Sequence, residues 1–151
     1  MADILPRVGI KASRNDVYRA LTTRDGLAAW WTNDTHAETE VGGALQFRFT
    51  ADGVEIGGFE MKVLDLAPGK HVLWEVVGGP AEWIGTTISW NLKQEDDYAI
   101  VLFKHEGWKE PAEFMHHCST KWALFLMSLK SLLETGRGAP SPNDTRIGNW
   151  H

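Results

Sequence analysis

Cysteine, blocks of positive charge and long apolar runs are all scarce in this chain of 151 residues. The single cysteine, Cys118, cannot form an internal disulfide, which is typical of proteins from a reducing compartment. Lys and Arg never gather in a block and the formal net charge is −5, so we expect no nucleic-acid partner. No apolar run approaches the roughly 20 residues that cross a bilayer. Residues 1–13 also lack the pattern of a signal peptide. We therefore expect a cytoplasmic protein with no membrane partner.

The sequence also lacks the short motifs of several enzyme classes. It contains no Gly-x-Ser-x-Gly motif, no phosphate-binding loop and no dinucleotide-binding glycine motif. The glycine pair at residues 42–43 opens a strand pattern, whereas the dinucleotide motif opens a helix. We therefore expect no cofactor.

Tryptophan, in contrast, is abundant, with 8 residues in the chain. Tryptophan is large and amphipathic and is enriched where ligands bind, but a single tryptophan can equally well fill a core. The remaining composition, 43% hydrophobic and 23% charged, is that of an ordinary globular protein. We expect one domain over residues 1–151, with enough apolar residues for a sizeable core.

The first part of the chain predicts a strand followed by two short helices. Residues 3–12 have the pattern of a strand. Ser13 is a suitable N-cap for a helix over residues 13–22, and Thr23 is one for a second helix over residues 23–31.

Alternating apolar residues then predict a series of antiparallel strands. The alternation is clearest in ALQFRFT (44–50), where Leu45, Phe47 and Phe49 share one face. Short turns link the strand patterns and indicate a meander. The other strand patterns cover residues 59–70, 71–77, 83–93 and 98–108.

The last predicted element is a long amphipathic helix from about residue 111 to 135, stopped by Gly136. A curved sheet must bury its apolar face, and this helix is the only predicted element large enough to cover it. The sequence therefore predicts an α+β fold, with a curved antiparallel sheet wrapped around the C-terminal helix and two short helices after the first strand. The apolar stripe of the helix consists of Phe114, Cys118, Trp122, Phe125, Leu129 and Leu132.

Several segments carry a family resemblance: ALTTRDGLAAWW (20–31), GGALQFRF (42–49), VLWEV (72–76), WIGTTISWNL (83–92), FKHEGW (103–108) and HCSTKWALFLMSLKSLLETGRGAP (117–140). With their order, the chain resembles the helix-grip fold of the START-like (SRPBCC) superfamily. The closer resemblance is to the bacterial single-domain branch of the family of activator of heat-shock chaperone ATPase homologues.

This resemblance implies an internal cavity gripped by the C-terminal helix. It does not imply chaperone activation, because the proteins that perform that task use a separate N-terminal domain for much of the chaperone contact. The sequence is expected to begin directly with the grip domain. The polyketide cyclases of the same superfamily perform acid–base chemistry in this cavity, so the scaffold allows an enzyme.

The stretch EFMHHCSTKW (113–122) places three potential metal ligands side by side: His116, His117 and Cys118. Neighbouring side chains on a helix diverge by about 100°, so these three cannot converge on one ion, and we expect no metal site. Cys118 lies on the apolar stripe, which favours a core residue over a catalytic nucleophile. One histidine is expected to face the mouth of the cavity and the other to face solvent.

His105 shares strand parity with Val101 and Phe103, on the expected inward face. A buried imidazole needs a hydrogen-bond partner, which either a ligand or a neighbouring protein group can supply. No inward acid is expected beside it, because Glu60 and Glu75 alternate with inward residues. A general-base role is therefore not indicated.

We expect the inward residues to line a cavity for a hydrophobic small molecule, aromatic or lipid-like. A binding domain is favoured over an enzyme; the alternatives are a cyclase-type cavity enzyme and a protein-interaction or chaperone-regulating module. The pattern leaves open whether the rings enclose a cavity or pack shut, and whether the chain is a monomer or a homodimer. The predicted ligand-binding residues are Trp31, Phe47, Phe49, Phe59, Met61, Trp74, Trp90, Phe103, His105, Trp108, Trp122 and Phe125.

Overall fold

The N-terminal strand pattern is interrupted near Pro6. The computed structural model describes residues 2–150, and within them the expected strand over 3–12 is divided into β1 (Ala2–Ile4) and β2 (Arg7–Ile10). Proline has no backbone N–H to donate, but the carbonyl of Pro6 accepts a hydrogen bond from the Phe103 N–H at 3.2 Å. Both short strands therefore still pair with the same neighbour, the last strand of the sheet.

The two predicted helices are present as α1 (Arg14–Thr22) and α2 (Arg24–Trp30). The hydroxyl of Ser13 accepts from the Asp16 N–H at 3.1 Å, and that of Thr23 accepts from the Gly26 N–H at 3.1 Å, so both N-caps are confirmed. The two helices meet closely, because a Cβ on Gly26 would lie 2.6 Å from the Cα of Ala20. Glycine at this position lets α2 turn toward the core.

The strands form one antiparallel sheet in the order β1-β8-β7-β6-β5-β4-β3, with β2 also paired to β8. The order confirms the predicted meander. The remaining strands are β3 (Asp34–Ala37), β4 (Ala44–Ala51), β5 (Val54–Ala67), β6 (His71–Gly78), β7 (Thr87–Glu95) and β8 (Tyr98–Trp108).

Three strand boundaries differ from the sequence prediction. The edge strand β3 was not expected. β5 begins at Val54 and not at residue 59, because the turn before it is completed by Asp52 and Gly53, both at positive φ. β7 begins only at Thr87, because residues 80–86 form a turn in which the Trp83 N–H donates to the Pro80 carbonyl at 2.9 Å.

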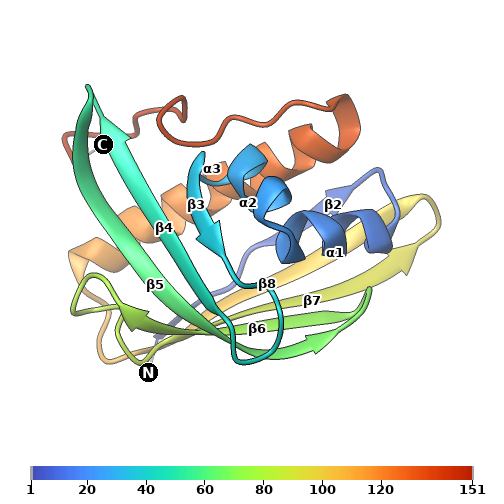
Figure 1. Ribbon diagram of the computed structural model, residues 1–151, viewed down its shortest axis with the longest axis horizontal. Coiled ribbons are helices and arrows are strands. Elements are labelled where there is room, and N and C mark those ends of the chain that lie inside the picture. The colour runs from blue at the N-terminus through green and yellow to red at the C-terminus, as the bar shows by residue number, and fades with distance from the viewer. Residues whose placement is uncertain (1, 151) are drawn as a thin grey trace.

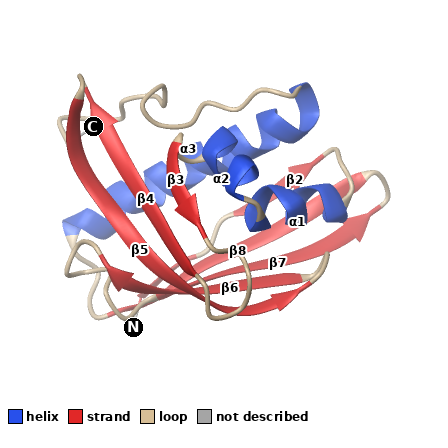
Figure 2. Cartoon of the chain, viewed as in Figure 1, coloured by secondary structure: helices blue, strands red, loops and turns tan. Residues whose placement is uncertain are grey.

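The long helix α3 (Glu113–Thr135) ends at Gly136, which has a left-handed φ of 85°, as the sequence predicts. All three helices lie within the curve of the sheet, on the same side of it (Figures 1 and 2). The predicted α+β helix-grip class is confirmed. Residues 137–150 then run back along α3 toward the ends of β4 and β5 that meet at their turn (Figure 1). None of the described helices is long and apolar enough to cross a membrane.

Trp122 of α3 lies at the centre of the core between helix and sheet. Its ring is 2% exposed and packs on the rings of Trp31 at 5.0 Å, Phe103 at 4.5 Å and Trp90 at 6.1 Å between centroids. Such pairs add to the stabilisation that each buried ring gives by leaving water. Over most of the sheet, the inward aromatic residues therefore pack against each other.

A fully buried histidine holds this ring in place. His105 of β8 is 0% exposed, and its Nδ1 accepts a hydrogen bond from the Trp122 indole N–H at 3.1 Å. Because indole can only donate, the imidazole proton belongs on Nε2, which lies 2.8 Å from the Thr86 hydroxyl oxygen. That hydroxyl in turn donates to the Trp83 carbonyl. Burial lowers the pKa of His105 to about 3, so the ring is neutral at physiological pH.

We predict that replacing Trp122 by Ala lowers the free energy of unfolding by about 3–5 kcal/mol, because it removes a large buried ring and leaves the His105 nitrogen without its donor. Denaturant titration measures this. Met127→Ala is the control on the same helix, since Met127 is 54% exposed, and we expect a change within about 0.5 kcal/mol. A Trp122→Ala cost below about 1 kcal/mol would contradict the packing described here.

We also predict that His105 makes the protein less stable as the pH falls from 6.5 toward 3. The unfolded chain takes up the proton near the ordinary pKa of 6.5, while the folded chain resists it down to about 3. Above pH 6.5 His105 causes no loss of stability. Between pH 6.5 and 3 the free energy of unfolding falls by at most about 1.4 kcal/mol per pH unit because of this residue.

Denaturant titrations at several pH values in this window measure the slope. His105→Gln should show a shallower slope than the unchanged protein, and the control His36→Gln, at an exposed histidine of β3, should not. Equal slopes for all three proteins would mean that His105 is protonated in the folded state.

Candidate functional site

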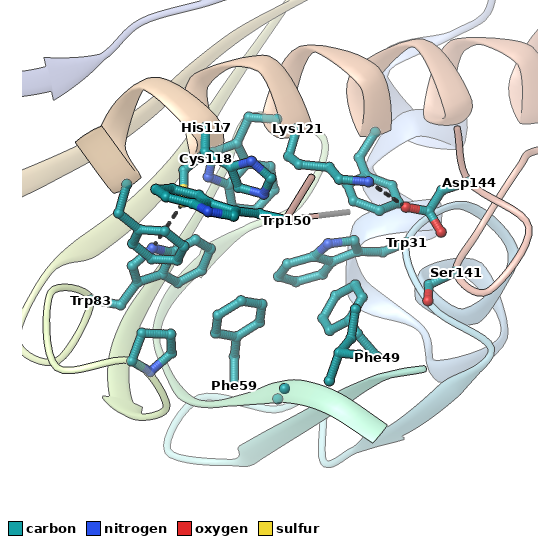
Figure 3. A pocket seen from close by; sticks show the side chains of 17 residues that line it. Trp31, Phe49, Phe59, Trp83, His117, Cys118, Lys121, Ser141, Asp144 and Trp150 are labelled. Carbon is teal, nitrogen blue, oxygen red and sulfur yellow. Dashed lines mark hydrogen bonds and ion pairs between the residues drawn. The ribbon is translucent and has the colours of Figure 1, made fainter. Parts of the chain in front are cut away.

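The aromatic rings of the core do not fill all of the space between helix and sheet. A pocket of about 190 Å³ lies beside the core, where the first half of α3 faces the start of β5 (Figure 3). The end of α2, the 80–86 turn and the C-terminal segment complete its wall. Ile56 is 51% exposed and Trp150 is 48% exposed, so both stand at the mouth. The lining residues are Trp31, Phe49, Ile56, Gly57, Gly58, Phe59, Pro80, Trp83, Phe114, His117, Cys118, Lys121, Trp122, Phe125, Ser141, Asp144 and Trp150.

Stacked aromatic rings make the wall rigid. Phe59 of β5 stacks on Trp83 with centroids 4.0 Å apart, and Trp83 stacks on Trp122 at 5.9 Å. Trp31 contacts both Phe59 and Trp122, at 6.1 and 5.0 Å. Phe49 closes the side nearest β4, 5.3 Å from Phe59 (Figure 3). Each ring is held by others, so the apolar surface offered to a ligand is largely formed in advance.

The predicted site residues divide into two groups. The pocket is lined by Trp31, Phe49, Phe59, Trp122 and Phe125. The structure places the others in the packed core and not in the pocket wall: Phe47, Met61, Trp74, Trp90, Phe103, His105 and Trp108. His105 in particular has protein partners at both ring nitrogens, so the polar anchor of any ligand has to be sought elsewhere.

The side chains of the His-His-Cys stretch diverge, as the sequence predicts. His116 is exposed, whereas His117 lines the pocket and packs its ring against Trp150 with centroids 5.5 Å apart. Cys118 is buried, and its sulfur accepts a hydrogen bond from the Trp83 indole N–H at 3.4 Å. Burial raises the pKa of the Cys118 thiol to about 12, so the thiol stays protonated and is a poor nucleophile. Within residues 2–150, no three His, Cys, Asp or Glu side chains gather as metal ligands would.

Two polar features stand out in this apolar wall. The first is an ion pair between the Lys121 ammonium and the Asp144 carboxylate, 2.6 Å apart, whose side chains are only 15% and 3% exposed. The Lys121 nitrogen also lies 5.7 Å from the centroid of the Phe125 ring, within the range of a cation–π contact.

The second feature is the hydroxyl of Ser141. Ser141 is 1% exposed and lines the pocket, and its Oγ has no hydrogen-bond partner among residues 2–150. The backbone beside it is well held: its N–H donates to the Trp31 carbonyl at 2.8 Å and its carbonyl accepts from the Asn33 N–H at 3.1 Å. Leaving a buried hydroxyl unsatisfied costs about 1–3 kcal/mol, so this atom marks where a polar group of a ligand can bind.

Sequence reasoning missed one whole wall of the pocket. Ser141, Asp144 and Trp150 belong to a segment with loop composition, and no periodicity indicates which way a loop side chain points. Phe114 and Cys118 could have been found, because they belong to the same helical stripe as Trp122 and Phe125. Trp83 was expected on a strand, but it reaches the pocket from a turn.

Comparison with known structures supports the fold and its family. A solution structure described as the Aha1 dimer from Colwellia psychrerythraea is 47% identical in sequence to this chain and has a TM-score of 0.81; the match covers 91% of this chain and 100% of that one. DynU16, a protein from the dynemicin biosynthetic locus, shares the fold at 20% identity and a TM-score of 0.71, with 90% of this chain and 48% of its own covered. CV1439 from Chromobacterium violaceum does so at 23% identity and a TM-score of 0.72, with 87% and 96% covered.

A comparison with curated proteins found no match. A family described as "Activator of Hsp90 ATPase homolog 1-like protein" matches residues 11–134, which include most of the sheet and nearly all of α3. The match agrees with the order of elements and with the closely similar Colwellia structure. The chain therefore belongs to the Activator of Hsp90 ATPase homolog 1-like family.

Proposed function

We propose that this protein binds a small apolar molecule that carries a polar group, in the pocket between α3, the start of β5 and the C-terminal segment. The observation that carries the proposal is the unpartnered, buried hydroxyl of Ser141 in a wall that otherwise consists mainly of aromatic rings. Concave, mostly apolar pockets with a few placed polar atoms are the usual form of small-molecule sites.

The volume of the pocket limits the size of the ligand that it can hold. Pockets for drug-sized ligands measure roughly 300–1,000 Å³, and an apolar cavity of about 150 Å³ is known to hold benzene. A volume of about 190 Å³ therefore suits one ring or a short hydrocarbon chain. Because the mouth is open at Ile56 and Trp150, a longer ligand would extend into solvent there.

The chemistry of the wall favours binding over catalysis. Among the described residues that line the pocket, the titratable side chains are His117, Cys118, Lys121 and Asp144. The thiol is protonated, and the lysine and the aspartate are paired with each other. A cyclase-type reaction would need a base positioned for proton transfer. His105, the strongest sequence candidate, does not line the pocket, and His117 lines it with its ring packed against the rings of Phe114 and Trp150.

We predict that benzyl alcohol and toluene both quench tryptophan fluorescence and raise the melting temperature, because they bind only the folded state. The two compounds differ by one hydroxyl group. Ser141→Ala should weaken benzyl alcohol about five- to tenfold, the worth of one hydrogen bond, and leave toluene unchanged. Ser119→Ala, at an exposed position of α3, is the control.

If neither compound changes fluorescence or melting temperature, and larger alcohols and acids also fail, the binding proposal is wrong. A protein-interaction role, as the family description suggests, then becomes the better hypothesis. If benzyl alcohol binds equally well to the Ser141→Ala variant, the pocket binds apolar molecules but Ser141 is not the anchor.

We propose further that the protein forms a homodimer, because the Colwellia relative at 47% identity is described as a dimer. Size-exclusion chromatography with light scattering should give about twice the mass of one 16.9 kDa chain at micromolar concentration. A mass of one chain at the highest soluble concentration would contradict the dimer without affecting the pocket.

A further inference from the structure

The ion pair in the pocket is made by two parts of the chain with different constraints. Lys121 belongs to the central turns of α3, which pack on the core. Asp144 belongs to residues 137–150, which contain no helix or strand beyond the isolated bridge at Ser141, and which lie after the family-matched region 11–134. The cation is therefore fixed on a rigid element, while its partner carboxylate is carried by an irregular segment (Figure 3).

The position of the pair is unusual for a structural contact. Both side chains are largely removed from water, at 15% and 3% exposed, and they line an apolar pocket. A buried ion pair of this kind recovers little net stability, because the desolvation of two charges offsets their attraction. If the partner aspartate were exposed instead, the long Lys121 side chain would extend and keep its ammonium in water.

The Asp144 carboxylate therefore lies where the carboxylate of a bound ligand would contact Lys121. It lies 2.6 Å from the Lys121 nitrogen, which also contacts the face of Phe125 in the pocket wall. Any small molecule with a ring in the pocket and an acid group at the Lys121 end would meet the same cation. The ammonium also donates to the Thr145 carbonyl at 3.1 Å, so two of its three N–H groups are bound to the C-terminal segment, and a ligand carboxylate competes with that segment for them.

We propose, resting on the proposed function above, that the preferred ligand is an apolar molecule bearing a carboxylate, and that it binds by exchanging its carboxylate for that of Asp144 on Lys121. The exchange releases residues 143–150 from the mouth of the pocket. The segment is then an internal competitor: a tethered carboxylate acts at an effective concentration on the order of millimolar and weakens the apparent affinity for every acid ligand.

The test compares phenylacetate with phenylacetamide, which share a ring and a size but differ in charge. Asp144→Asn removes the competing carboxylate, so it should tighten the binding of phenylacetate at least tenfold and change the affinity for phenylacetamide less than twofold. Removing the cation by Lys121→Met should weaken phenylacetate at least tenfold and again spare phenylacetamide. Isothermal titration measures all the affinities.

Asp97→Asn is the matched control. It removes the same charge at an exposed position in the turn between β7 and β8, so it reports the general effect of net charge on the binding of an anion. If Asp97→Asn tightens phenylacetate as much as Asp144→Asn does, the exchange at Lys121 is excluded.

Hydrogen–deuterium exchange on the unchanged protein tests the release of the segment without relying on any variant. Saturating phenylacetate should accelerate amide exchange in residues 143–150, and saturating phenylacetamide should not. Unaltered or slower exchange with phenylacetate overturns the displacement.

The outcomes separate this inference from the proposed function. Equal binding of both compounds, unaffected by Asp144→Asn, leaves the pocket a ligand site and overturns only the preference for acids. Absence of binding by either compound to every variant overturns this inference, and it overturns the proposed function as well if benzyl alcohol and toluene also fail to bind.

Discussion

The hydrogen bond from the Trp122 indole to the His105 imidazole joins the long helix to the sheet at the centre of the molecule. It requires a neutral imidazole with its proton on Nε2, a state that burial and the Thr86 hydroxyl both favour. Once Trp122 points at the sheet, the 100° spacing of helical side chains determines where its neighbours point. Cys118 and Phe125 then face inward, and Lys121 stands at the border of the pocket. The contact that closes the core thus also sets out one side of the candidate site.

The high tryptophan content reflects packing as well as binding. Three indole N–H groups in the core have protein acceptors: Trp30 donates to the Ala20 carbonyl, Trp83 to Cys118 and Trp122 to His105. These three rings are therefore buried with their polar edge satisfied, whereas the indole N–H groups of Trp90 and Trp108 have no partner among the described residues. Among the tryptophans of the core, Trp31, Trp83 and Trp122 also line the pocket.

The sequence predicted the scaffold well, because its periodicities are strong. The cap residues Ser13 and Thr23, the alternation in β4 and β8, and the glycine that stops α3 each act through local geometry. His105 was correctly placed on the inward face, but parity cannot distinguish a side chain that meets a ligand from one that meets Thr86 and Trp122.

The edge strand β3 and the pocket wall beyond α3 escaped prediction for a different reason. Residues 34–37 (DTHA) are too few and too polar to show a period, and they become a strand only by pairing with β4. The C-terminal segment is placed by backbone hydrogen bonds to Trp31 and Asn33, which depend on the folded position of α2. Such long-range contacts leave no pattern in a single sequence.

The C-terminal segment that forms one wall of the pocket lies outside the part of the chain that carries most of the fold. The region matched by the family carries nearly all of the sheet and the helices, while Ser141, Asp144 and Trp150 come after it. Substitutions or length changes in this segment would alter the polarity and the opening of the pocket without disturbing the interlocked rings. Ligand preference is therefore open to change through residues of this segment while the packed rings are retained.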